Sequence, residues 1–132
     1  MKIARILLLA LLCCLALPAA MAQEAADITK SCTLTSAGKG KGQLQRMRDR
    51  DYDTGMKLAG GKELLIESRE PVSGVMIKYY LTPVALELQA ERDGAWEKVA
   101  DLGLHLSDWV AVPEGTTRLR LLNGGETSAS VA

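Results

Sequence analysis

The fold class of this chain is decided by residues 84–99, Val84-Ala-Leu-Glu-Leu-Gln-Ala-Glu-Arg-Asp-Gly-Ala-Trp-Glu-Lys-Val99. Up to Glu91, apolar residues alternate with mainly polar ones, which is the period of a strand that buries one face. The dipeptide Asp93-Gly94 then separates two such segments, and it suits the two-residue turn of a hairpin. The stretch therefore predicts an antiparallel hairpin that joins Val84–Glu91 to Ala95–Val99.

Other short segments with strand character lie on both sides of this hairpin, and turns rich in Gly, Pro and Asn separate them. These segments are Ile28–Thr35, Lys62–Glu67, Gly74–Leu81, Trp109–Val112 and Thr116–Leu122. One helical turn is expected near Gln43–Met47, but no long amphipathic helix that could cross between parallel strands. Many short strands with such turns predict an all-β, antiparallel sandwich or barrel.

The first 22 residues have the features of a secretory signal peptide. Lys2 and Arg5 precede the apolar run Ile6–Leu17, and Ala20-Met21-Ala22 has the small residues of a cleavage site. The alternative is a membrane anchor, but this run is shorter than the roughly 20 residues that span a bilayer. We therefore predict a signal peptide at 1–22, one secreted domain at 23–132, and no membrane span.

Charge and cysteine content exclude several classes of protein. Without the leader, 14 basic and 16 acidic residues remain, and a nearly neutral surface argues against nucleic acid as a partner. Cys32 is then the only cysteine, so an intramolecular disulfide is impossible, and we expect a buried strand thiol. His105 is the only histidine, and no nucleophile–base set can be assembled around it. An enzyme is therefore not expected.

The loop Arg48-Asp-Arg-Asp-Tyr-Asp-Thr-Gly55 is the candidate cation site. Its alternating carboxylates, Asp49, Asp51 and Asp53, are the oxygen ligands that Ca²⁺ prefers. It is not an EF-hand, because Gly60 stands where the twelfth loop position requires Glu. The alternative is that the aspartates cap turns while neighbouring arginines balance their charge. A structural Ca²⁺ is the only cofactor that the sequence suggests.

The order of these elements resembles the galactose-binding-like jelly roll, the discoidin or coagulation factor 5/8 type C family, over roughly Ala26–Ala132. Asp49-x-x-x-x-Thr54 is similar to the family's Asp-Gly-x-x-x-Thr-x-Trp loop, Gly60–Glu67 to its first long core strand, and Gly94–Val99 to a hairpin that carries an aromatic residue. The resemblance implies an antiparallel jelly-roll β-sandwich. Arg50 replaces the family's usual Gly, and Met56 its usual Trp.

The C-terminal strand is expected to be abbreviated or missing. Thr127–Val131 has the residues to begin a strand, but the chain ends before the Glu that the family's last strand normally carries. An incomplete sandwich would leave an open edge, which another segment could complete. This favours an alternative function as a protein–protein or scaffold module, or as the N-terminal piece of a larger exported protein.

The resemblance also implies where a ligand binds, because the family uses the loops at the end of the sandwich that contains Arg48–Thr54. We predict Arg48, Arg50, Tyr52 and Tyr80 as ligand contacts, whereas Trp109 in its strand pattern is expected in the core. The leading hypothesis is a secreted, non-enzymatic module that binds carbohydrate or another cell-surface polymer.

Overall fold

The computed structural model describes residues 26–51, 53–78, 85–102 and 107–132. The predicted signal peptide therefore lies outside the described residues. The elements in chain order are the 3-10 turn η1 (Thr29–Ser31), β1 (Thr33–Thr35), α2 (Lys41–Gln45), β2 (Met56–Leu58), β3 (Glu63–Glu67), β4 (Gly74–Lys78), β5 (Leu86–Arg92), β6 (Ala95–Asp101), β7 (Ser107–Ala111), β8 (Arg118–Asn123) and β9 (Ala129–Val131). No described helix is long and apolar enough to cross a membrane.

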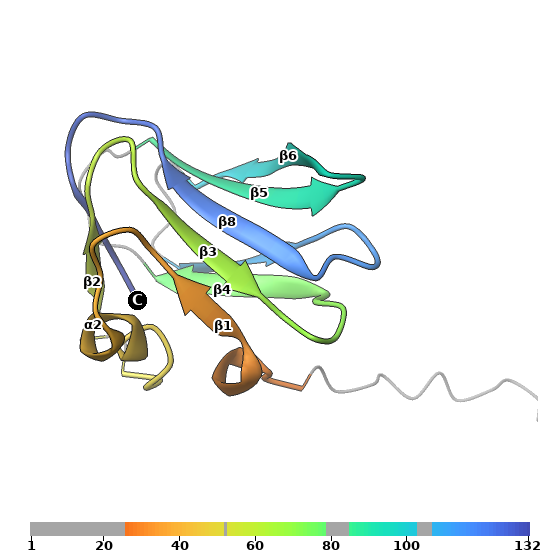
Figure 1. The fold of residues 1–132 in the computed structure, drawn as a ribbon, viewed down its shortest axis with the longest axis horizontal. Coiled ribbons are helices and arrows are strands. Elements are labelled where there is room, and N and C mark those ends of the chain that lie inside the picture. The colour runs from red at the N-terminus through yellow and green to blue at the C-terminus, as the bar shows by residue number, and fades with distance from the viewer. Residues whose placement is uncertain (1–25, 52, 79–84, 103–106) are drawn as a thin grey trace, which may run out of the picture.

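The strands form two layers, as Figure 1 shows, with β4 and β7 beneath the larger sheet. The larger sheet has five strands in the order β1-β3-β8-β5-β6, and β2–β9 and β4–β7 form separate two-stranded ladders. Every pairing is antiparallel. The predicted all-β, antiparallel sandwich is therefore confirmed.

The predicted hairpin is also confirmed for Leu86–Val99, whereas Val84 lies outside the described residues. Arg92 pairs directly with Ala95, so Asp93 and Gly94 alone form the turn. Both have a positive φ, 50° and 79°, as a type I′ turn requires at its two central positions. Gly adopts this conformation without steric cost, which explains why the Asp-Gly dipeptide predicted the turn.

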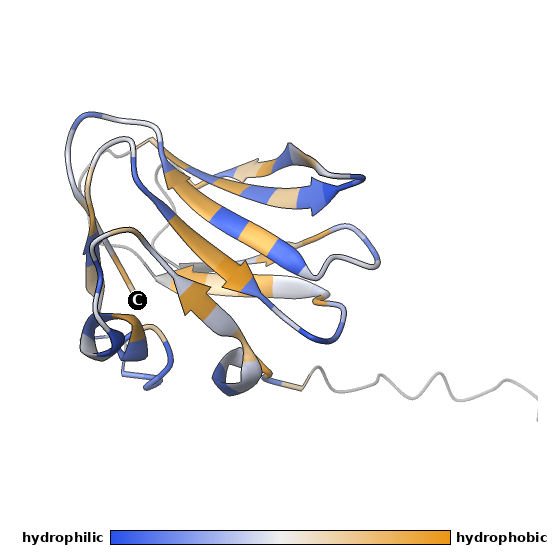
Figure 2. Cartoon of the chain, viewed as in Figure 1, coloured by the Kyte–Doolittle hydropathy of each residue, from blue (hydrophilic) through white to orange (hydrophobic). Residues whose placement is uncertain are grey.

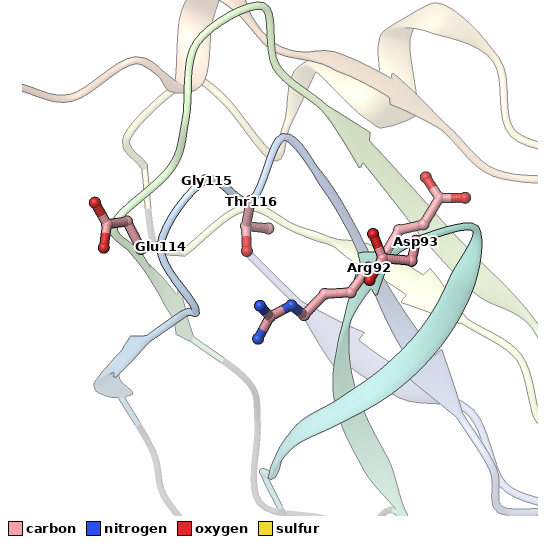
Figure 3. Close-up of a pocket in the computed structure, with 6 residues that line it drawn as sticks. Arg92, Asp93, Glu114, Gly115 and Thr116 are labelled. Carbon is pink, nitrogen blue, oxygen red and sulfur yellow. The ribbon is translucent and has the colours of Figure 1, made fainter.

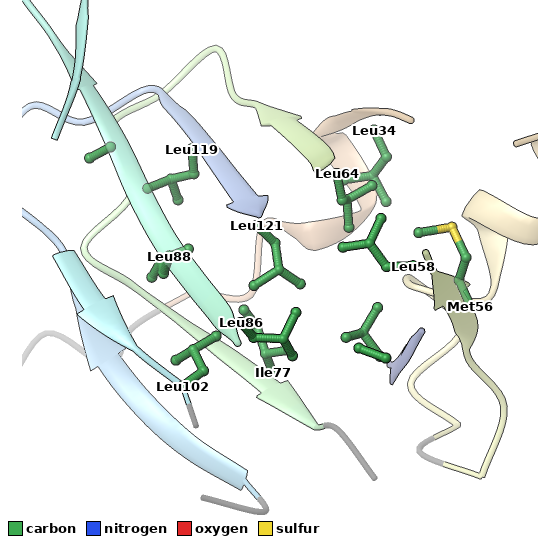
Figure 4. Close-up of a cluster of buried hydrophobic side chains, with 13 residues drawn as sticks. Leu34, Met56, Leu58, Leu64, Ile77, Leu86, Leu88, Leu102, Leu119 and Leu121 are labelled. Atoms are coloured by element: carbon green, nitrogen blue, oxygen red, sulfur yellow. The ribbon is translucent and has the colours of Figure 1, made fainter. Parts of the chain in front are cut away.

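The core lies between the two layers (Figure 4). Strand β8 shows how the sequence builds it: Leu119 and Leu121 are fully buried, whereas Arg118, Arg120 and Leu122 face outward and are half-buried. Figure 2 shows this alternation along the strand. The buried cluster contains Leu34, Met56, Leu58, Leu64, Ile77, Leu86, Leu88, Ala90, Leu102, Leu119, Leu121, Ala129 and Val131. Removing these apolar surfaces from water is the main stabilising contribution to the fold.

The last strand is short but present. The three residues of β9 pair with β2, so that Met56 lies opposite Val131 and Leu58 opposite Ala129. Both β9 residues are completely buried. The predicted last strand is therefore short but present, and the protein–protein or scaffold alternative stays a prediction.

Candidate functional site

The aspartates of the Arg48–Gly55 loop organise its backbone. The Asp49 carboxylate accepts hydrogen bonds from the Asp51 amide at 2.9 Å and from the Thr54 hydroxyl at 2.7 Å. The Asp51 carboxylate accepts one from the Asp53 amide at 3.0 Å, and the Thr54 amide donates to the Asp51 carbonyl at 3.2 Å. These are the local bonds by which aspartates stabilise turns, and they link Asp49, Asp51, Asp53 and Thr54 to one another.

The same hydrogen bonds occupy carboxylate oxygens of Asp49 and Asp51 that the predicted calcium site would need. Nowhere in the described ranges do three or more His, Cys, Asp or Glu side chains gather in a way that could hold a metal ion. The Thr54 hydroxyl, followed by the Asp51 amide, lowers the pKa of Asp49 below its ordinary value. The geometry therefore favours the turn-capping alternative, and Ca²⁺ binding by Asp49, Asp51 and Asp53 stays a prediction.

The two predicted ligand-binding arginines lie on this loop in different environments. Arg50 has a positive φ of 61°, and its guanidinium contacts the Asp27 carboxylate at 2.7 Å. The Arg50 side chain is nevertheless 64% exposed. Arg48 is half-buried, and its Nε is buried without a hydrogen-bond partner among the residues that the structure describes. The other two predicted contacts, Tyr52 and Tyr80, lie outside the described residues.

Trp109 is exposed, and not in the core as its strand pattern predicted. Its side chain is 52% exposed, and Met76, its cross-strand partner on β4, is 53% exposed. The prediction was wrong because the neighbouring Val110 and Val112 pack against the core, and alternation along β7 then turns Trp109 outward. This pair of valines was the signal in the sequence that could have identified an exposed tryptophan.

A glycine lies beneath the Trp109 ring. A Cβ added at Gly74 would come within 2.5 Å of the ring atom Cε2 and 2.9 Å of Cη2, which is closer than real atoms approach. The indole therefore covers the Gly74 backbone, and only glycine leaves room for it there. The result is a supported, solvent-facing aromatic ring on the outer side of the β4–β7 ladder.

The outer face of the five-stranded sheet holds the other tryptophan, Trp96, under two arginines. The guanidinium carbons of Arg120 and Arg118 lie 4.7 and 5.7 Å from the centre of its ring. Arg118 pairs with Glu91 and with Glu67, and hydrogen bonding to Glu91 raises the pKa of Arg118. Because the arginines cover the Trp96 ring and carboxylates balance their charge, this network stabilises the sheet and leaves little of the ring for a ligand.

A small polar hollow lies at the end of the sandwich that carries the β5–β6 turn (Figure 3). Its volume is about 210 Å³, below the roughly 300 Å³ at which ligand pockets usually begin. It is lined by Glu91, Arg92, Asp93, Glu114, Gly115 and Thr116. Figure 1 places it away from α2 and β2, so it is separate from the Arg48–Gly55 loop.

Comparison with known proteins identifies the fold. No protein-family model and no curated protein sequence matches the chain. Among solved structures, CpGH89CBM32-6 of Clostridium perfringens is similar, with 13% identity, a TM-score of 0.55, and coverage of 76% of this chain and 90% of that one. An F5/8 type C domain from Bacteroides fragilis has 11% identity, a TM-score of 0.59, and coverage of 81% and 92%.

A third similar structure is chitosan-binding module 1 from a chitosanase/glucanase of Paenibacillus sp. IK-5. It has 16% identity, a TM-score of 0.57, and coverage of 81% of this chain and 95% of that one. All three have the galactose-binding-like, discoidin type of sandwich. The resemblance noted in the sequence is therefore confirmed at the level of the fold. Sequence identities of 11–16% support a shared fold and do not by themselves support a shared ligand.

Proposed function

We propose that this chain is a secreted, non-enzymatic module that binds carbohydrate through the loop end formed by Arg48–Thr54. Two of the similar structures are named as carbohydrate-binding or chitosan-binding modules, which supports this class of function. The observation that carries the proposal is the preorganised loop, in which Asp49 and Thr54 fix the backbone while the Arg50 side chain stays accessible.

Preorganisation matters because an ordered loop loses little conformational entropy when a ligand binds. The internal bonds of Asp49 and Asp51 use the carboxylates for the loop itself. The guanidinium of Arg50 is then the accessible charged donor, and its planar N–H groups suit sugar hydroxyls, carboxylates and sulfates alike. Arg48, Tyr52 and Tyr80 complete the proposed contact set, with the tyrosines supplying aromatic surface.

A glycan array followed by titration calorimetry on residues 23–132, with and without Ca²⁺, tests this proposal. We expect a bound glycan whose affinity falls at least about tenfold in the Arg50→Ala variant, since truncating a central arginine contact commonly has that effect. Arg69→Ala is the matched control, because Arg69 is also exposed but lies in the β3–β4 loop, toward the other end of the sandwich. Absence of binding, or an equal loss in the two variants, would refute the proposal.

Secretion is tested separately. Expression of the full chain in a bacterial host should release a mature protein whose first residue is Gln23, as determined by intact-mass spectrometry. A protein that retains residues 1–22 in the exported fraction would contradict the proposed signal peptide.

A further inference from the structure

We propose a second carbohydrate site on the outer face of the β4–β7 ladder, where Trp109 forms a platform for a ring of a neutral polysaccharide. This face is separate from the Arg48–Thr54 loop, and its proposed ligand needs no charge. The proposed second site uses different residues from the loop-end site. Experiments can therefore refute either site without refuting the other.

The register of the two strands defines the platform. Trp109 lies opposite Met76, and Ala111 lies opposite Gly74. These four residues share the outer side, because the alternating positions Val75 and Val110 pack against the core. Gly74 and Ala111 are small, so the exposed side chains on this side are those of Trp109 and Met76, and the indole lies against Gly74.

The extent of this surface favours a small occupant. A tryptophan or other large aromatic side chain has about 150–250 Å² of surface, so a half-exposed Trp109 together with Met76 offers on the order of 200 Å². A stable protein–protein interface needs about 800 Å² from each partner. The platform alone is thus too small for a second protein chain, whereas a sugar ring covers a surface of this size.

The chemistry of the platform favours a neutral sugar. The face of an indole ring carries negative charge density, and it attracts the weakly positive C–H groups on the apolar side of a pyranose. Met76, Trp109 and Ala111 carry no charge, and the nearest charged residue at an alternate position of β4 is Lys78, which pairs with Ser107 at the end of the ladder. A ligand held here gains by removing apolar surface from water, which makes its binding insensitive to salt.

The two tryptophans of the chain allow a direct test. In a Trp96→Phe variant, Trp109 is the only tryptophan, and its fluorescence reports contact with a ligand. We expect N-acetylchitohexaose or cellohexaose to shift the emission saturably, with an affinity that is unchanged between low and high salt. In the otherwise wild-type chain, Trp109→Ala should weaken calorimetric binding of the same oligosaccharide at least about tenfold.

A second variant keeps Trp109 and changes only Gly74, the residue that its indole ring contacts. Gly74→Ala forces the indole away from the β4 backbone, so we expect weaker binding with Trp109 still present. Thermal unfolding of Gly74→Ala and Trp109→Ala checks that both proteins remain folded. Arg50→Ala in the Trp96→Phe background should leave the emission shift unchanged, which separates the platform from the loop end.

Three outcomes would overturn the platform. The first is that neither oligosaccharide alters Trp109 emission. The second is that Trp109→Ala binds the oligosaccharide as well as the wild-type chain does. The third is that ultracentrifugation shows a dimer that Trp109→Ala converts to a monomer, because the face would then be an interface between copies of the chain.

Discussion

The buried side chain of Asn123 donates a hydrogen bond to the main-chain carbonyl of Leu58 at 2.9 Å, and so ties the end of β8 to β2. The same amide nitrogen donates to the Thr127 carbonyl at 2.8 Å, and its oxygen accepts from the Gly125 amide at 3.1 Å. One fully buried amide therefore shapes the turn that brings β9 back to its partner strand.

Replacing Asn123 with Ala should destabilise the protein by about 2–3 kcal/mol, because buried backbone groups lose their partners. Urea unfolding monitored by circular dichroism measures the change. Thr127→Ala is the control, since the Thr127 side chain is exposed and only its carbonyl takes part. A loss for Asn123→Ala no larger than that of the control would contradict the assigned role.

Two adjacent leucines of β8 should respond very differently to truncation. Leu121→Ala removes a fully buried side chain from the core and should cost about 2–5 kcal/mol of unfolding free energy. Leu122→Ala truncates a half-buried residue on the outer face, so its cost should be clearly smaller. Equal costs in the same urea titration would mean that the strand does not alternate as described.

The contact between Trp96 and Arg120 should contribute measurably to stability. A double-mutant cycle with Trp96→Leu and Arg120→Met should give a coupling energy of about 0.5–2 kcal/mol, the range for a partly desolvated cation over an aromatic ring. The matched cycle with Arg118→Met should give a smaller coupling, because Arg118 lies farther from the ring. A zero coupling for Arg120 would show that the contact is not stabilising.

The Asp49–Thr54 hydrogen bond predicts a specific pH dependence for the loop. Because this bond lowers the pKa of Asp49, its stabilising contribution is complete above the ordinary value of 3.8 and is lost as the pH falls through the lowered pKa. NMR titration of the Asp49 carboxyl carbon should show the lowered pKa. Thr54→Val should raise that pKa toward the ordinary value, and Thr54→Ser, which keeps a hydroxyl, should leave it low.

An Asp49 pKa that is equal in the wild-type chain and in Thr54→Val would rule out this hydrogen bond in solution. The same titration repeated with Ca²⁺ addresses the metal prediction independently. Ca²⁺ binding would displace protons from the carboxylates and change the loop resonances at constant pH.

Much of the fold could be predicted because its signals are local. The alternation in residues 84–91, the Asp93-Gly94 turn and the outward arginines of β8 all follow from the pleat of a strand and the φ preference of glycine. The candidate site was less predictable. The sequence pattern singled out the loop of Asp49 and Arg50, but whether its carboxylates converge or turn toward their own backbone depends on the loop's three-dimensional path.

Local sequence patterns specify where strands and turns form, because each depends on residues that are neighbours along the chain. Long-range packing then selects which strand edges pair and which faces of the strands are covered. Residues 129–131 gain a partner only when β2, far away in sequence, lies beside them. Trp109 faces water because Val110 and Val112 occupy the core side of β7, and its ring lies against β4 because that strand contributes Gly74 there. Which strands pair and which side chains face water depend on which distant segments bury the most apolar surface when they pack together. A local sequence pattern does not specify how distant segments pack.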